Sequence, residues 1–255
     1  MIRVVNVTHH YGIRPVLRNV NLEVRPGEML CVMGPNGMGK TTLLNVAAGI
    51  LWPIRGYTEI GGKLRRGSVE EEIAIREMVF YLPDHPWLPA TASGREYLVN
   101  IGKIYSIDDD RLLDHIYRLL LLFELAALED APIASYSNGQ KKKIAVAGAL
   151  VSEAPVMIMD EPFSGGMDPS ALFSLKQVMQ HLARREDVTI LMATPVPELV
   201  EGLAHRIAIL RGGEIVACDT PDALRRLAGC RGPLEEVLEK LINPETMEHI
   251  EEYIK

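Results

Sequence analysis

The sequence predicts an α/β fold built on a mostly parallel sheet, with an antiparallel β edge subdomain and an inserted helical subdomain. Continuous apolar runs at residues 28–33, 156–160 and 188–194 are typical of strands that are buried on both faces. Stretches with helical spacing separate these runs, and such alternation favours a parallel sheet. A purely helical stretch at about 84–150 interrupts the alternation, so we expect a single domain over residues 1–255 that carries a helical subdomain.

Composition and charge narrow the class of protein. The chain has 255 residues, 47% of them apolar, which is enough for a large folded core. Lys and Arg number 27 against 34 Asp and Glu, so the net charge is −7 and we expect no nucleic-acid partner. The cysteines, Cys31, Cys218 and Cys230, are scattered, which favours a reducing compartment over a disulfide framework. Because the sequence has neither a membrane-length apolar run nor the apolar core of a signal peptide, we expect a cytoplasmic protein.

The N-terminal part begins with β structure. Residues 2–12 and 17–28 alternate between apolar and polar side chains around a turn at Tyr11–Gly12, which predicts antiparallel edge strands. The buried strand at 28–33 then ends in a glycine-rich loop. Further along we expect a helix, a short strand with a turn, and a buried strand, at residues 40–51, 56–62 and 78–83.

The inserted block contains two predicted helices. Residues Ser93–Glu124 carry apolar side chains along one side and predict one long helix. The leucines at 119–122 exceed what one helix face needs, so we expect this helix to be wedged between others. A further helix at Ser137–Val151 has an N-cap candidate in Ser137.

The C-terminal third returns to alternating elements. Asp168 and Pro169 have the N-cap and first-turn chemistry that opens a helix. Residues 206–210 and 214–218, joined by two glycines, predict a hairpin. From about 220 to 255 we expect a charged, helical C-terminal extension whose polar face is solvated, with a partner contact as the alternative. Its predicted helical segments are 221–229, 233–242 and 244–255.

A motif with a specific chemical use follows the first buried strand. The stretch "GPNGMGKTT" fits G-x-x-x-x-G-K-[ST] and lies between a strand and a helix. Glycines let backbone N–H groups point inward around an anion, and the helix adds its positive end. Lys40 supplies a cation for the β- and γ-phosphates, and Thr41 a hydroxyl for Mg²⁺. We therefore expect a P-loop NTPase core that binds a nucleotide through Gly34, Pro35, Asn36, Gly37, Met38, Gly39, Lys40, Thr41 and Thr42.

Two acids end another buried strand. The stretch "VMIMDEP" places Asp160 and Glu161 at its carboxyl end. In P-loop enzymes a strand-terminal Asp holds Mg²⁺, and an adjacent Glu can orient or deprotonate the attacking water. For these two acids alone, an ordinary strand exit into a turn is the alternative. Beside a phosphate loop, they predict a metal ligand in Asp160 and a catalytic pair in Glu161 and Lys40.

These motifs, in this order, resemble the nucleotide-binding subunit of an ATP-binding-cassette (ABC) transporter, of export type, over roughly residues 2–241. "GPNGMGKTT" resembles the family's Walker A loop, and "VMIMDEP" its Walker B segment with the catalytic acid at Glu161. "SYSNGQKKK" lies where the family's LSGGQ signature lies, and "SGGMDP" resembles its D-loop with Asp168 at the acid. The resemblance implies ATP and Mg²⁺ as cofactors. It also implies that Tyr11 stacks on adenine, with a plain turn tyrosine as the alternative.

The resemblance further implies two protein partners. In the family, two such domains meet head to tail, and each ATP lies between one Walker A loop and the other chain's signature. Such a dimer would place Ser137, Asn138, Gly139 and Gln140 against the nucleotide of a second ABC subunit, in a homodimer or a heterodimer. The pair would drive an integral-membrane permease, through which the chain would lie at the inner face of the membrane.

Three positions depart from the family's pattern. The family has Gln after the strand at 78–83, where this chain has Asp84, which could still reach Mg²⁺ or its waters. The second signature residue is Asn138 where the family has glycine. The switch histidine after the strand at 188–194 is replaced by Pro195, which cannot donate a hydrogen bond. His205 is not a substitute, because it precedes the next strand. We therefore expect good MgATP binding and slow intrinsic hydrolysis.

The function predicted from these features is that of a transport ATPase subunit with a separate permease, which would dock at residues 84–90 with Trp87 as an anchor. Local packing of Trp87 is the alternative at that position. A non-transport ABC ATPase, such as a cofactor-assembly factor, and a regulatory nucleotide sensor are alternative functions. The transported substrate is not encoded in any feature that we identify, and export is favoured over import only because the tail stretches "CDTPDAL" and "GPLEEVLEKL" resemble the C-terminal extension of export-type subunits.

Overall fold

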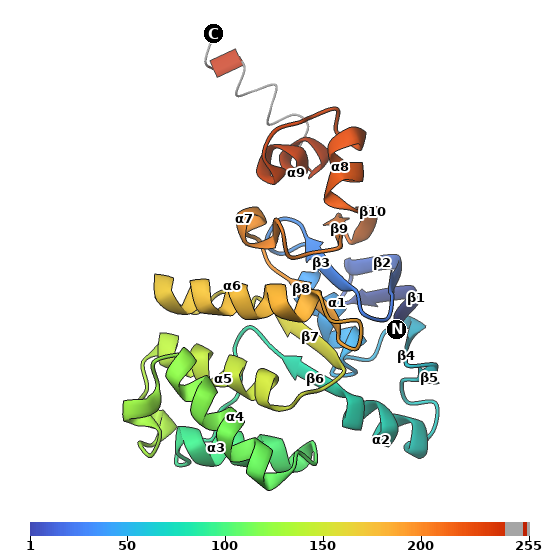
Figure 1. Ribbon diagram of the computed structural model, residues 1–255. Coiled ribbons are helices and arrows are strands. Elements are labelled where there is room, and N and C mark those ends of the chain that lie inside the picture. Colours follow the sequence, from blue (N-terminus) through green and yellow to red (C-terminus); the bar gives the residue numbers. More distant parts are fainter. Residues whose placement is uncertain (243–251, 254–255) are drawn as a thin grey trace.

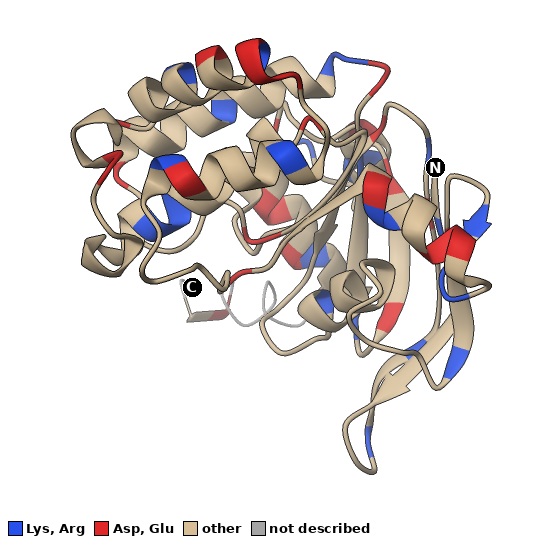
Figure 2. Ribbon diagram, turned by 90° about the horizontal axis from the view of Figure 1, so that it is seen from below, with Lys and Arg blue, Asp and Glu red and all other residues tan. Residues whose placement is uncertain are grey.

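The computed structural model describes residues 1–242 and 252–253, and the predicted helix at 244–255 lies almost entirely outside these residues. Figure 1 shows strands through the centre, with α3, α4 and α5 at one end of the molecule and α8 and α9 at the opposite end. Figure 2, turned by 90°, shows Lys and Arg interspersed with Asp and Glu along the helices of this face.

The larger sheet has the strand order β10-β9-β3-β8-β7-β6. The pairs β9–β3, β3–β8, β8–β7 and β7–β6 are parallel, and β10 pairs with β9 in an antiparallel hairpin. The mostly parallel sheet expected from the sequence is therefore confirmed. Its strands are β3 (Met29–Met33), β6 (Val79–Leu82), β7 (Val156–Asp160), β8 (Thr189–Ala193), β9 (Arg206–Arg211) and β10 (Glu214–Asp219).

Each central strand is apolar because both of its faces are covered. Along β3, Cys31 faces a hydrophobic cluster shared with the helices α3 to α6, whereas Leu30 and Val32 face a second cluster around α1 and the smaller sheet. Because β3, β8 and β7 run parallel, their carboxyl ends lie at one edge of the sheet. That edge carries the glycine-rich loop and the acids after β7.

The smaller sheet is antiparallel, as expected, with the order β2-β1-β4-β5. Its apolar side chains alternate inward along β1 and pack over α1, which follows the glycine-rich loop. The strands are β1 (Ile2–His10), β2 (Pro15–Val24), β4 (Arg55–Ile60) and β5 (Lys63–Leu64).

The helices divide into those that flank the sheet and those of the inserted block. The first set is α1 (Lys40–Ala47), α2 (Val69–Met78), α6 (Pro169–Ala183), α7 (Pro197–Val200), α8 (Pro221–Leu227) and α9 (Leu234–Ile242). The inserted block holds α3 (Gly94–Ile104), α4 (Asp109–Leu122) and α5 (Asn138–Val151), with short 3₁₀ turns at Ala126–Leu128 and Ile133–Ser135. Among the described residues, none of the helices has both the length and the apolarity needed to cross a membrane.

Three expectations for the helices were wrong or incomplete. The single helix predicted at Ser93–Glu124 is broken into α3 and α4, because Ser106 adopts a left-handed φ of 57° and Asp108 caps a new helix. The leucine run is not wedged on all sides, since Leu121 and Leu122 are 49% and 36% exposed. The helix α2 was not predicted, although the cap of Ser68, which accepts a hydrogen bond from Glu71 N, is an ordinary start signal.

Candidate active site

The glycine-rich loop joins β3 to α1 with backbone angles that residues other than glycine seldom adopt. Gly34, Gly37 and Gly39 have φ angles of 156°, 79° and 99°. A Cβ on Gly34 would lie 2.2 Å from Leu210 O, and one on Gly39 would lie 2.9 Å from Val16 Cγ1. α1 has no side-chain cap, so the N–H groups of its first turn remain available to an anion. The loop has the geometry of a phosphate cradle.

Lys40 is folded back onto this loop. Its Nζ donates to Gly34 O at 2.7 Å and to Pro35 O at 3.1 Å, and the residue is 5% exposed. Burial lowers the pKa of Lys40, and the nearby carboxylates of Glu161 and Asp160 act in the opposite direction. An incoming polyphosphate offers this ammonium a better partner than carbonyl oxygens do, so the lysine is placed to change partners on nucleotide binding.

Asp160 ends β7 as a buried carboxylate without a hydrogen-bond partner. The residue is 1% exposed, and neither side-chain oxygen makes a hydrogen bond of normal geometry. Burial raises its pKa, the nearby Thr41 hydroxyl lowers it, and the charge of Asp84 raises it further. Since buried polar groups are nearly always paired, an orphan carboxylate indicates a position meant for a cation. Mg²⁺ fits, because it takes one or two carboxylates together with phosphates and waters.

Glu161 follows directly in a strained conformation. Its φ is 47°, in the left-handed region that non-glycine residues seldom adopt, and its N–H donates to Ala193 O at 2.8 Å. Burial raises the pKa of Glu161, and the charges of Asp84 and Asp160 raise it further. A half-buried carboxylate with a raised pKa beside a phosphate loop suits a general base.

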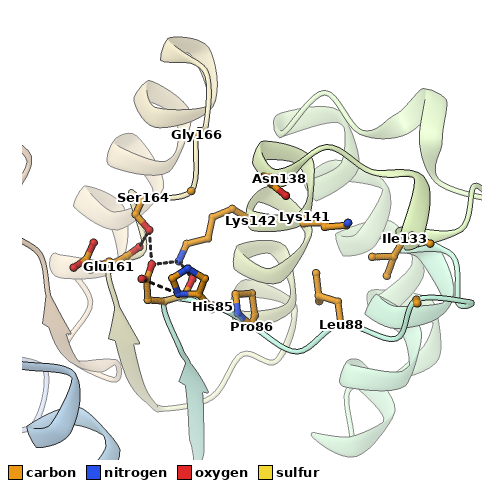
Figure 3. A pocket seen from close by; sticks show the side chains of 14 residues that line it. His85, Pro86, Leu88, Ile133, Asn138, Lys141, Lys142, Glu161, Ser164 and Gly166 are labelled. Carbon is orange, nitrogen blue, oxygen red and sulfur yellow. Dashed lines mark hydrogen bonds and ion pairs between the residues drawn. The ribbon is translucent and has the colours of Figure 1, made fainter.

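Asp84 lies beside these acids but is held by other partners. Lys142 Nζ donates to Asp84 O at 2.9 Å and forms an ion pair with Oδ1 at 3.6 Å. The Ser164 hydroxyl donates to Oδ1 at 2.7 Å, and His85 Nδ1 is 3.0 Å from Oδ2. These residues line a cavity of about 710 Å³ between the sheet and the inserted helices, in which Lys142 and Ser164 point toward each other (Figure 3).

Comparisons with known proteins identify the family to which this chain belongs. Residues 17–164, more than half of the chain, match the family described as ABC transporter. The chain belongs to the ABC transporter family. Its fold is that of a solved ATP-binding subunit of an ABC transporter.

Individual relatives are transporter subunits of several kinds. The chain is 31% identical to the energy-coupling factor transporter ATP-binding protein EcfA of Methanothermobacter thermautotrophicus, over 81% of this chain and 66% of the relative. It is 31% identical to the daunorubicin resistance ATP-binding protein DrrA3 of Streptomyces coeruleorubidus, over 86% and 68%. It is 29% identical to the choline transport ATP-binding protein OpuBA of Bacillus subtilis, over 97% and 63%. The chain thus spans roughly two thirds of the length of these relatives.

Solved structures agree on the fold. A structure of an ATP-binding subunit of an ABC transporter superposes with a TM-score of 0.86 at 29% identity, covering 94% of this chain and 99% of that chain. A dimeric ATP-binding cassette bound to ADP and phosphate after hydrolysis matches with a TM-score of 0.77, over 86% of this chain and 98% of that chain. At 23% identity, the second likeness shows the fold alone.

The ABC signature segment begins α5. Ser137 Oγ accepts from Gln140 N at 3.3 Å, and Gln140 Oε1 accepts from Ser137 N at 2.8 Å, so the two form a capping box. A Cβ on Gly139 would come within 2.5 Å of Gly166 O, which shows how closely the signature approaches the D-loop of the same chain. Asn138 lines the cavity beside Asp84.

The D-loop acid Asp168 caps a helix and is tied to the signature helix. It accepts from Ala171 N at 2.9 Å, as expected for the N-cap of α6, and pairs with Lys143 Nζ at 2.5 Å. The hydrogen bond from Lys143 lowers the pKa of Asp168. In this structure the acid is therefore engaged within its own chain.

The remaining predicted binding residues are Tyr11 and the two threonines that follow Lys40. Tyr11 is 60% exposed in the turn between β1 and β2, with its ring edge-on to His9 at 4.9 Å between centroids. An exposed aromatic ring is available for stacking on a base. Thr41 is exposed at the start of α1, whereas Thr42 is buried.

Pro195 lies exposed after β8 and lines a cavity of about 300 Å³ with the phosphate-loop residues 33–36 and helix α9. The Oγ1 of Thr194 accepts from Val196 N at 3.3 Å, so this hydroxyl is occupied locally. His205 accepts from Met29 N at 3.0 Å, which puts it at the start of β3, while the phosphate loop follows the end of β3. Sequence position had already indicated that His205 is no substitute for the switch histidine.

Two residues of this site were not identified from the sequence, Lys142 and Ser164. Their signal was the lysine run after the signature and the serine that opens the D-loop. Neither pattern says which of the lysines are buried; Lys142 and Lys143 are 3% and 5% exposed.

Proposed function

We propose that this chain is the ATP-binding and ATP-hydrolysing subunit of an ABC transporter, which drives a separate membrane permease by ATP-dependent dimerisation. The observation that carries the proposal is the position of Lys40, folded onto the glycine-rich loop after β3, near the unpartnered carboxylate of Asp160 at the end of β7. A cation for phosphate groups and a carboxylate for Mg²⁺ are the two groups that a P-loop site brings together.

The residues take distinct roles in this proposal. Lys40 leaves the carbonyl oxygens of its own loop and binds the β- and γ-phosphates. Asp160 and Thr41 hold Mg²⁺, which neutralises phosphate charge when bound. Glu161 orients and deprotonates the attacking water, a role that its raised pKa suits. Tyr11 stacks on the base.

The proposed protein partners are a second ABC subunit and an integral-membrane permease. The named relatives include ATP-binding proteins for choline transport and for daunorubicin resistance, so they do not indicate a direction or a substrate. Trp87 is 86% exposed, next to His85, Pro86 and Leu88, which line the large cavity. We assign this segment to the permease contact, because a large exposed aromatic side chain is a common interface anchor.

Transport coupling is tested by isolating membranes in which the tagged chain is expressed at native level. We expect an integral-membrane protein to co-purify and to stimulate hydrolysis of MgATP. Trp87→Ala lowers this stimulation and leaves hydrolysis by the isolated chain unchanged, and Trp52→Ala, another exposed tryptophan at 58% exposure, serves as the matched control. Recovery of the chain only from the soluble fraction, with no membrane protein attached, would contradict the proposal.

Slow intrinsic hydrolysis is the finer part of the proposal. Loss of one preorganised contact to the transition state lowers kcat by about 10²- to 10³-fold. Pro195 removes such a contact, and Thr194 is engaged with Val196. Pro195→His is expected to raise kcat by at least about tenfold, with Val196→His as the control for adding an imidazole nearby. Fast turnover by the unaltered chain, or an equal effect of both variants, would refute this part.

A further inference from the structure

Asp84 is held by groups from two distant segments and by its own neighbour, with Lys142 donating to its backbone oxygen and pairing with its carboxylate at 3.6 Å. Lys142 belongs to the signature helix α5, Ser164 to the loop after Walker B, and His85 is the neighbour of Asp84 in the chain. His85 has a side chain that is 95% exposed, so its bond adds little. The two bonds that join distant parts of the chain are those from Lys142 and Ser164.

Lys142 is buried between the signature helix and the D-loop. The residue is 3% exposed, and its aliphatic stem packs against the D-loop, where a Cβ on Gly165 would meet Lys142 Cβ and Cγ at 3.1 Å. Its ammonium reaches both the backbone oxygen and the carboxylate of Asp84. A buried ammonium of this kind needs its anion, because removal of one member of a buried pair leaves the other charge uncompensated.

The site carries an excess of negative charge near Asp84, the partner of Lys142. Asp84 adds a third carboxylate beside Asp160 and Glu161, at a place that also receives the negative charge of a polyphosphate. Lys40 is committed to the phosphate loop. Lys142 is therefore the cation that balances Asp84.

We propose that Lys142 is a positioning residue of the ATPase that acts through Asp84, so that the two side chains function as one neutral unit between the catalytic acids and the signature helix. The pair fixes where the Asp84 carboxylate lies relative to Glu161. It also ties α5, whose N-cap is the signature residue Ser137, to the same point. Removal of either side chain leaves the charge of the other uncompensated, whereas removal of both leaves no unpaired charge.

A double-mutant cycle tests this unit. Lys142→Met and Asp84→Asn each remove one charge at nearly constant shape, and each alone lowers kcat by about tenfold, the size of an ordinary contact coupling. The double variant returns to within about threefold of the native kcat instead of the roughly hundredfold loss that independent effects would give. Lys142→Arg keeps most of the activity. Lys141→Met, the adjacent lysine on the same helix, is the matched control and has the native kcat.

Two readouts separate positioning from a general structural role. Lys142→Met leaves KM for ATP within about threefold, because its nitrogen contacts Asp84 and not the phosphate loop. Asp84→Asn lowers Tm by about 5 °C in the nucleotide-free protein, and adding Lys142→Met restores most of this loss. The Tm cycle needs no hydrolysis, so it tests the coupling of the two side chains even where the proposed function fails, while the split between kcat and KM tests the positioning role that rests on that function. Independent, additive effects on both kcat and Tm would overturn it.

Discussion

Replacement of the buried carboxylate Asp160 by an amide tests two effects of this residue separately. One is its effect on the stability of the ligand-free chain, and the other is its proposed role as a metal ligand. At 1% exposure and with both oxygens unpartnered, the ionised side chain destabilises the folded chain before any metal binds. An unsatisfied buried group costs about 1–3 kcal/mol, and more where it is charged. For Asp160→Asn we expect a free energy of unfolding about 2 kcal/mol higher without nucleotide, which corresponds to a Tm about 4–8 °C higher in a chain of this size.

The sign of this effect with pH follows from the raised pKa of Asp160. Burial lifts the folded-state pKa above its ordinary value, so the folded chain holds the proton more tightly than the unfolded chain does. The carboxyl group is least unfavourable below its ordinary pKa, and stability is lost as pH rises through the folded-state pKa. The Tm advantage of Asp160→Asn is therefore complete above the folded-state pKa and shrinks toward zero as pH falls below the ordinary pKa of an aspartate.

Thermal unfolding followed by circular dichroism, with and without MgATP, measures both parts of this prediction. MgATP raises Tm of the native chain by mass action and leaves the variant nearly unchanged, since the variant has lost the metal ligand. Glu77→Gln, which removes an exposed acid on α2, controls for net charge. A nucleotide-free Tm below the native one, or a full response of the variant to MgATP, would refute the reasoning.

Two further substitutions test other parts of the site. Tyr11→Ala removes an exposed ring, and we expect the ATP affinity measured by titration to fall about tenfold, because stacking on a base is worth about 1–3 kcal/mol. Tyr11→Phe keeps the ring, so its affinity stays near that of the native chain. Equal affinity of all three proteins would exclude a stacking role. Gly39→Ala adds a methyl group at a φ of 99° within 2.9 Å of Val16 Cγ1. It should lower Tm by about 3–10 °C, more than Gly37→Ala, which meets nothing within 4 Å, and the reverse order would contradict the loop geometry.

Local signals in the sequence were sufficient to predict the elements on either side of the phosphate loop. Strand β3, the glycines that follow it and the N-cap of α5 depend on neighbours within a few residues, so pattern and capping chemistry identify them. The break between α3 and α4 was missed because apolar periodicity continues across it, while Ser106 turns left-handed.

The arrangement around Asp84 depends on tertiary packing instead. Lys142 is 58 residues further along the chain, and its two lysine neighbours look the same in the sequence. Lys142 and Lys143 are both buried, and the burial of Lys142 follows from how α5 packs on the D-loop, where Gly165 leaves room for its stem. A departure from the family pattern at Asp84 was visible in the sequence, but its compensation by Lys142 was not.

Titration of MgATP into the folded chain in a calorimeter tests most directly whether the loop around Lys40 and the acid at Asp160 form a nucleotide site. We predict saturable heat for the native chain and a large loss of affinity for Lys40→Ala, whose fold is checked by its unfolding curve. Absence of heat with the native chain, or identical titrations of the two proteins, would contradict the assignment of this edge of the sheet to ATP.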